Sequence, residues 1–296
     1  MPLQSFKKIL RDALEGGYAV GYFEPWDQYS MEAVILAAEN LNSPVIIGCG
    51  GIMMNQRWFD SGGMECLESI GRILAERAKV PTALMLNEAV TFEQIIRGLS
   101  LGFNAVMLHT SSLSFEENIQ ITKRIVEAAH ALGVDVEAEL GHVPLGSGEK
   151  GKNEGSLTDP DQAVEFILRT GADALAVSIG NIHIMLEGKA DKLDFERLGK
   201  IHQKVDTPLV IHGSTGFPDS AISKVILLGV AKFNVGTMLK KAFWLGLKEA
   251  IDSTPENANP HDVIGSRKGS DIVAHAHDLM RQGVERLIAL YLNKQD

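Results

Sequence analysis

A short apolar segment places several groups capable of chemistry in one turn. Leu209–Ile211 is too short and too β-branched for a helix and is typical of a buried strand. The segment from His212 to Gly216 follows it, and its glycines and hydroxyls suit the binding of a phosphate. The imidazole beside them is a candidate metal ligand. The alternative is that these residues only cap the next helix.

Polar and ionisable residues follow other short apolar segments too. In chain order these positions are Glu24, Gly50, Gly51, Asn87, Glu88, His109, Glu139, His183, His212 and the run Asn234-Val235-Gly236-Thr237. A single histidine or glutamate of this kind is most often a hydrogen-bonded structural residue. Together they exceed what packing requires, and this favours one functional site.

The elements that position these residues alternate along the whole chain. The expected strands are Ala19–Phe23, Pro44–Ile47, Thr82–Leu86, Ala105–Leu108, Asp135–Glu139, Ala174–Val177, Leu209–His212 and Lys232–Val235. Amphipathic helices are expected at Ser30–Leu41, Gly63–Arg77, Thr91–Leu101, Phe115–Leu132, Pro160–Thr170, Asp194–Val205 and Pro218–Leu228. Such alternation requires parallel strands with right-handed crossovers, and eight units favour a closed (β/α)8 TIM barrel. In such a barrel the strand ends converge on one face.

No linker divides the chain, so the sequence predicts a single domain over residues 1–296. The barrel occupies about residues 1–240, and additional C-terminal helices are expected at Ala242–Ile251 and Gly269–Leu292. Gly141–Leu157 is predicted to be a long polar loop.

Composition excludes several classes of function. The 296 residues carry 28 Lys and Arg against 38 Asp and Glu, a net charge of −10, which disfavours nucleic acid or an anionic membrane as partner. Cys49 and Cys66 are the two cysteines, so no disulfide framework is indicated. The first 14 residues lack the apolar core of a signal peptide, and no apolar run has the length of a membrane span. A cytoplasmic location is expected.

Six motifs carry a resemblance to a known family. They are Tyr18–Phe23, Ser43–Gly48, Val136–Gly141, Gly180-x-x-His183, His212–Gly216 and Asn234–Thr237. In order and spacing, from Met1 to about Gly265, they resemble the class II, metal-dependent ketose-bisphosphate aldolases. The resemblance implies a TIM barrel, a homodimer or homotetramer, and a divalent metal, usually zinc, that stabilises an enediolate formed from a sugar phosphate.

The resemblance also implies roles for individual residues. His183 and His212 match two of the three metal-ligand histidines. The positions that match the segments holding the ketose phosphate are Gly213, Ser214, Thr215, Asn234, Gly236 and Thr237. Arg267 and Lys268 stand where the family has an arginine for the far phosphate, although they could be ordinary surface charges. Glu149 matches the loop glutamate that moves a proton, with Glu154 as the alternative.

Departures from the family pattern concentrate at the third strand. Met85-Leu86-Asn87-Glu88 replaces His-Leu-Asp-His, so Asn87 occupies the acid/base position without being able to exchange a proton. Glu88 can complete a His₂Glu set for zinc, manganese or iron, or form a salt bridge. Either His109 or Glu24 then supplies the proton chemistry, and His109 is preferred because its usual pKa lies near neutrality.

The sequence therefore predicts a metal-dependent aldolase, a carbon–carbon lyase acting on a phosphorylated ketose or related sugar. An epimerase or isomerase of a sugar phosphate remains an alternative, because it needs proton transfer at carbon rather than an acid at the leaving hydroxyl. A catalytically inactive sugar-phosphate-binding relative is the other alternative.

Overall fold

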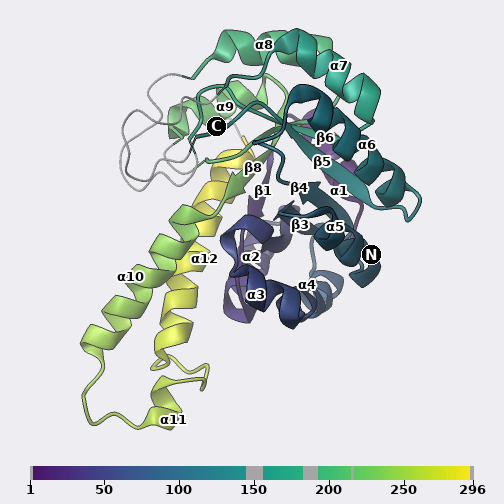
Figure 1. The fold of residues 1–296 in the computed structure, drawn as a ribbon. Coiled ribbons are helices and arrows are strands. Elements are labelled where there is room, and N and C mark those ends of the chain that lie inside the picture. The colour runs from purple at the N-terminus through teal and green to yellow at the C-terminus, as the bar shows by residue number, and fades with distance from the viewer. Residues whose placement is uncertain (1–2, 145–155, 183–192, 215–216, 294–296) are drawn as a thin grey trace.

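The computed structural model describes residues 3–144, 156–182, 193–214 and 217–293. Eight parallel strands close into a barrel in chain order, with β8 hydrogen-bonded to β1 (Figure 1). The strands are β1 (Val20–Phe23), β2 (Val45–Gly50), β3 (Thr82–Ala89), β4 (Ala105–Leu108), β5 (Asp135–Leu140), β6 (Ala174–Val177), β7 (Leu209–Ile211) and β8 (Val230–Val235). The predicted (β/α)8 barrel is confirmed.

Helices surround the barrel and extend beyond it. They are α1 (Phe6–Gly16), α2 (Gln28–Asn40), α3 (Gln56–Trp58), α4 (Met64–Arg77), α5 (Phe92–Leu101), α6 (Phe115–His130), α7 (Pro160–Thr170), α8 (Phe195–Lys204), α9 (Asp219–Ile226), α10 (Thr237–Ser253), α11 (Pro260–Val263) and α12 (Ile272–Tyr291). Two short helical turns, η1 (Gly51–Met53) and η2 (Phe59–Gly63), connect β2 to α4.

The barrel has two apolar layers. Side chains on the outer strand faces pack under the helices, and the inner layer contains small residues such as Ala83, Ala105 and Ala174. Helix α1 joins the inner layer through Phe6 and Leu10, which are fully buried. The sequence analysis did not predict this helix, although Phe6, Ile9, Leu10 and Ala13 follow helical spacing.

Local signals in the sequence agree with the structure at several helix ends. Ser114 and Glu117 form the predicted capping box of α6, and Asp159 caps α7 ahead of Pro160. Strand β7 ends at Ile211, one residue earlier than predicted. The reason is that the carbonyl of His212 accepts a hydrogen bond from the Asn181 side chain, at 2.8 Å, instead of pairing with a strand.

The two long C-terminal helices form an arm. Helices α10 and α12 pack against each other and project from the barrel, and α12 also packs on α2 (Figure 1). Helix α10 begins at Thr237, directly after β8, so the predicted start at Ala242 was too late. Over the part of the chain that the structure describes, no helix is long and apolar enough to cross a bilayer.

Candidate functional site

A backbone irregularity at the end of β3 turns two neighbouring residues into the barrel. Regular alternation would send Glu88 to the outer face, as it does Leu84 and Leu86. Instead the register with β4 shifts between Leu86 and Ala89, and Glu88 has a φ of +48°, a left-handed conformation that is unfavourable for a glutamate. Such strain costs roughly 1–3 kcal/mol and is typical of functional sites. Both Asn87 and Glu88 are buried as a result.

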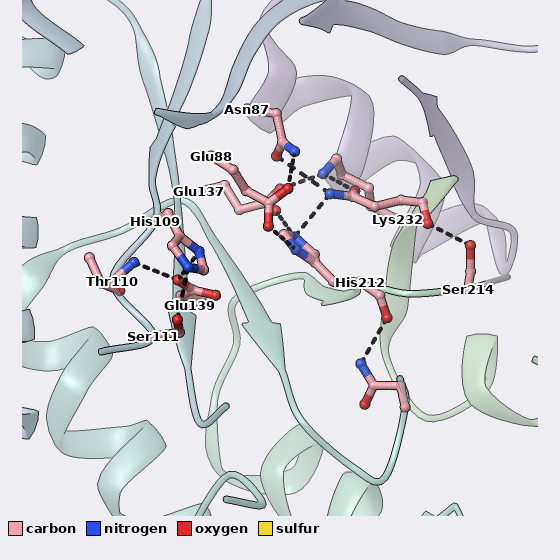
Figure 2. Close-up of polar contacts among 12 residues, drawn as sticks. Asn87, Glu88, His109, Thr110, Ser111, Glu137, Glu139, His212, Ser214 and Lys232 are labelled. Carbon is pink, nitrogen blue, oxygen red and sulfur yellow. Dashed lines mark hydrogen bonds and ion pairs between the residues drawn. The ribbon is translucent and has the colours of Figure 1, made fainter. Parts of the chain in front are cut away.

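His212, at the end of β7, faces Glu88 with one ring nitrogen and Glu137 with the other. Its Nε2 lies 2.7 Å from Glu137 Oε1, and its Nδ1 lies 3.5 Å from Glu88 Oε1 (Figure 2). A carboxylate on the far nitrogen is the usual support for a metal-binding histidine. Two ligands of one tetrahedral zinc, each about 2.1 Å from the ion, lie about 3.4 Å apart. The separation of Glu88 and His212 therefore fits a shared metal ion.

The third predicted ligand, His183, lies outside the described residues. Within the described ranges, no group of three or more histidine, cysteine, aspartate or glutamate side chains is placed to hold a metal. The positions of Glu88 and His212 thus fit a metal ion, and His183 stays a prediction as the third ligand.

Beneath His212 lies a buried ion pair that the sequence analysis did not assign to the site. Lys232, on β8, has no exposed surface, and its Nζ lies 2.8 Å from Glu137 Oε2 and donates to Asn234 Oδ1 at 2.5 Å. Asn234 Nδ2 is consequently turned toward His212 Nε2, 3.0 Å away. A signal was present in the sequence, because Lys232 interrupts a strand that is otherwise largely apolar and a buried lysine needs a charged partner.

The neighbouring charges in these contacts shift the pKa values of His212 and Glu137. Burial alone would lower the pKa of His212, but Glu137 and Glu88 outweigh burial and raise it to about 9. Burial likewise disfavours an ionised Glu137, yet the Lys232 ammonium and His212 hold its pKa below the usual value. Binding of a metal at Nδ1 of His212 would displace the proton that the two carboxylates otherwise favour.

Asn87 is tied to Glu88 rather than free for proton transfer. Its Nδ2 donates to Glu88 Oε2 at 2.9 Å, and its Oδ1 accepts from Asn234 Nδ2 at 3.4 Å. An aspartate here would set a second carboxylate against Glu88, and two adjacent carboxylates cannot both ionise without cost. The asparagine and the glutamate therefore suit each other, which gives a physical reason for the two departures to occur together.

A second polar cluster lies beside the first, at the ends of β4 and β5 (Figure 2). His109 Nδ1 is 3.2 Å from Glu139 Oε1, and His109 Nε2 is 2.8 Å from Ser111 Oγ. The backbone N–H of Thr110 donates to Glu139 Oε1 at 2.6 Å. Hydrogen bonding to Glu139 raises the pKa of His109, while partial burial opposes the rise. The side chain of His109 is 33% exposed, so its ring can reach a ligand.

Glu24, at the end of β1, lies in a cradle of two glycines. A Cβ at Gly50 would come within 1.8 Å of Glu24 Oε1, and one at Gly236 within 2.5 Å of Glu24 Oε2. The carboxyl group is 9% exposed, and the Oε1 atom has no hydrogen-bond partner among the described residues. Burial raises the pKa of Glu24 to about 7, although Lys240, 4.0 Å away, opposes the shift.

The residues predicted to bind phosphate lie in two places, the loop after β7 and the end of β8 with the start of α10. Gly213 adopts a left-handed φ of +64°, and Gly236 precedes the first turn of α10, where Thr237 begins the helix. The hydroxyl of Ser214 donates to the carbonyl of Asn234 at 2.6 Å, so its proton is already used. Thr215 lies outside the described residues. Backbone N–H groups at the start of α10 are suited to an anion.

The remaining predicted residues lie apart from His212 or fall outside the described residues. Arg267 and Lys268 lie on the arm between α11 and α12, where they pair with Glu32 and Asp262, and Arg267 also covers the ring of Tyr29. Neither carboxylate partner belongs to the cluster around His212. Glu149 and the alternative Glu154 fall outside the described ranges.

Replacement of Lys232 tests the buried ion pair. Lys232→Met would leave the Glu137 carboxylate buried without its ammonium, so we expect a loss of about 3–5 kcal/mol in the free energy of unfolding, measured by urea denaturation. The double variant Glu137→Gln/Lys232→Met should lose less, because no charge is stranded. A loss below about 1 kcal/mol in the single variant would contradict the importance of this pair.

Glu24→Gln tests the cradle of Glu24. Because the pKa of Glu24 is raised to about 7, the stability associated with its neutral form is lost as the pH rises through 7. The glutamine variant should gain roughly 2 kcal/mol relative to wild type between pH 5 and pH 8 in denaturant titrations. Glu32→Gln is the matched control: burial would raise the pKa of Glu32, but Arg267 holds it below its usual value, so its contribution to stability changes only at pH values below this window. This variant should follow the wild type between pH 5 and pH 8. Equal pH dependence in wild type and Glu24→Gln would refute the assignment.

Comparisons with known proteins match one family over nearly the whole chain. A family model described as fructose-bisphosphate aldolase class-II matches residues 4–294. The chain is 37% identical over 268 residues to the fructose-bisphosphate aldolase of Geobacillus stearothermophilus, a match that covers 90% of this chain and 91% of that protein.

Solved structures of similar proteins have the same fold. The YdjI aldolase from Escherichia coli K12 has a TM-score of 0.80 at 32% identity, over 98% of this chain and 97% of that one. A putative fructose-1,6-biphosphate aldolase from Coccidioides immitis has a TM-score of 0.82 at 28% identity, over 97% and 95% of the two chains. The chain therefore belongs to the class II fructose-bisphosphate aldolase family, whose members are metal-dependent lyases acting on phosphorylated sugars.

Proposed function

We propose that this chain catalyses reversible aldol cleavage of a phosphorylated ketose at a site built from Glu88, His183 and His212. The observation that carries the proposal is the 3.5 Å separation of Glu88 Oε1 and His212 Nδ1, with Glu137 holding the other ring nitrogen. Zinc is the proposed ion, with manganese or iron as alternatives for a His₂Glu set. When bound, it would polarise the substrate carbonyl and stabilise the enediolate.

His109 is the proposed proton donor and acceptor of this reaction. Asn87 stands at the acid/base position of the family and cannot release a proton at neutral pH. His109 carries a partly exposed imidazole held by Glu139, and the charges of Glu88 and His212 both act on it. In cleavage it would take the proton of the substrate hydroxyl, and in condensation it would return it. Glu149 remains a prediction for the proton at the enediol carbon.

The substrate phosphate is assigned to the segment after β7 and the start of α10. The proposed contacts are Gly213, Ser214, Thr215, Asn234, Gly236 and Thr237. Support comes from the first backbone N–H groups of α10, which receive no side-chain cap because Gly236 precedes the helix. Since the Ser214 proton goes to the Asn234 carbonyl, this side chain would orient the loop rather than donate to phosphate.

A homodimer or homotetramer is proposed for the assembled protein. The arm exposes large apolar side chains, among them Trp244, Ile251 and Ile264, and isolated arms with such surfaces are typical of subunit interfaces. Arg267 and Lys268 lie on the same arm, so in an assembly they are candidates to approach the phosphate of a neighbouring subunit. The single domain over residues 1–296 is part of this proposal.

Epimerisation of a sugar phosphate is the second candidate. The observation in its favour is the presence of two proton-exchanging groups on different strands, Glu24 at β1 and His109 at β4, each near neutrality or shifted toward it. Two groups of this kind can remove a proton from one face of a carbon and return it to the other. Exchange of carbon-bound hydrogen with deuterated water, without release of a three-carbon fragment, would favour this reaction.

The metal content of the purified protein tests the site itself. Elemental analysis should find about one zinc, manganese or iron per chain, and Glu88→Ala and His212→Ala should each lose it. Glu68→Ala, a buried glutamate bound to Arg72 on α4, is the matched control and should keep the metal. Wild type without metal after incubation with zinc or manganese would overturn the proposal. A sugar phosphate that raised the melting temperature without turnover would then identify a binding protein.

The role of His109 is tested through the pH profile. Since Glu139 raises the pKa of His109, Glu139→Gln should move the acidic limb of the cleavage rate to lower pH. His109→Gln should lower kcat by about 100-fold or more and remove that limb. A limb that stays in place in both variants, with kcat near wild type, would show that another group handles the proton.

A further inference from the structure

A small cavity opens beside the second polar cluster. It has a volume of about 170 Å³ and lies between the loop after β4, the end of β5 and the segment before α7. Its lining includes Thr110, Ser111, Leu113, Phe115, Leu140 and Leu157. The hydroxyl-bearing turn at residues 110–111 therefore opens onto a partly apolar space that is distinct in its lining from the contacts of His212.

Ser111, which lines this cavity, contacts two side chains behind it in the arrangement of an activated nucleophile. Ser111 Oγ is 2.8 Å from His109 Nε2, and His109 Nδ1 is 3.2 Å from Glu139 Oε1. This is the order of contacts in which a serine is activated by a base that a carboxylate orients. Glu139 is itself fixed, because the backbone N–H of Thr110 donates to its Oε1 at 2.6 Å.

The residue before the serine, Thr110, carries a buried hydroxyl. Thr110 is 3% exposed, and its Oγ1 makes no hydrogen bond with the residues that the structure describes. A buried hydroxyl without a partner is unfavourable unless a ligand or water supplies one. Because Thr110 lines the cavity next to Ser111, this hydroxyl is available to donate to a ligand bound there.

We propose that Ser111, His109 and Glu139 form a nucleophilic triad that hydrolyses short-chain acyl esters, with the Thr110 hydroxyl donating to the developing oxyanion. The volume of the cavity limits the acyl group to a few carbons, since a cavity of about 150 Å³ accommodates a molecule the size of benzene. The activity shares His109 with the proposed aldol reaction but needs neither the metal ion nor its proposed ligands.

The chemical steps balance without a further reactant. Ser111 Oγ attacks the ester carbonyl while its proton passes to His109 Nε2, and Glu139 stabilises the imidazolium. The bond to the alcohol oxygen breaks, and that oxygen leaves with the proton from His109. Water, deprotonated by His109, then attacks the acyl group and releases the carboxylic acid and the free serine.

Covalent labelling of the full-length protein is the direct test. Diisopropyl fluorophosphate, which attaches to activated serines with loss of fluoride, should modify Ser111 in the wild type, as located by peptide mass spectrometry. Ser111→Ala should abolish the label, whereas Ser112→Ala, a neighbouring exposed serine in the same turn, should retain it. A wild-type protein without label at Ser111 would overturn the proposal.

Hydrolysis of p-nitrophenyl acetate separates the triad from a metal-activated water. The rate should survive treatment with a chelator that removes the metal and stops sugar-phosphate cleavage. Ser111→Ala should abolish it, Glu139→Gln should lower it at least tenfold, and Thr110→Val should lower it about tenfold or more. Hydrolysis that is lost with the metal and retained in Ser111→Ala would refute the triad while leaving the aldol proposal intact.

Discussion

The buried pair of Lys232 and Glu137 is the interaction on which the geometry of the site depends. Both side chains are without exposed surface, so each charge is tolerable only because the other compensates it. Lys232 also fixes the Asn234 amide, and Glu137 fixes the His212 ring. The orientation of His212 Nδ1 toward Glu88 follows from these contacts beneath it. A preorganised ligand of this kind needs no rearrangement when an ion binds.

The end of β3 shows that its two departures from the family pattern, Asn87 and Glu88, are compatible with each other. A left-handed backbone at Glu88 brings two consecutive residues to the interior, where regular alternation allows one. Once a carboxylate stands at position 88, an amide at position 87 can donate to it, whereas an acid would compete with it. The amide at position 87 is thus linked to the carboxylate at position 88, and the proposed mechanism accordingly assigns the proton chemistry to another strand.

Two environments around Glu88 and His212 give ionisable groups different properties. Glu139 stabilises the charged form of His109, in a partly exposed position. Glu24 lies in an enclosed glycine cradle, where burial stabilises the neutral form. The pKa of each group is raised by a different cause, hydrogen bonding in His109 and desolvation in Glu24. A site of this composition can exchange protons on more than one side of a bound sugar, which is why cleavage and epimerisation compete as interpretations.

The sequence by itself determined the barrel, the order of its strands, and most of the residues at their ends. Hydrophobic periodicity and glycine positions are local properties, so they can be recognised in the sequence without knowledge of the fold. Contacts such as Glu137 with Lys232, or His109 with Glu139, depend on how the strands that carry them are placed around the barrel. The inward turn of Glu88 depends on one dihedral angle. These features were decided only by the tertiary structure, because they arise from long-range packing and backbone strain that no local pattern encodes.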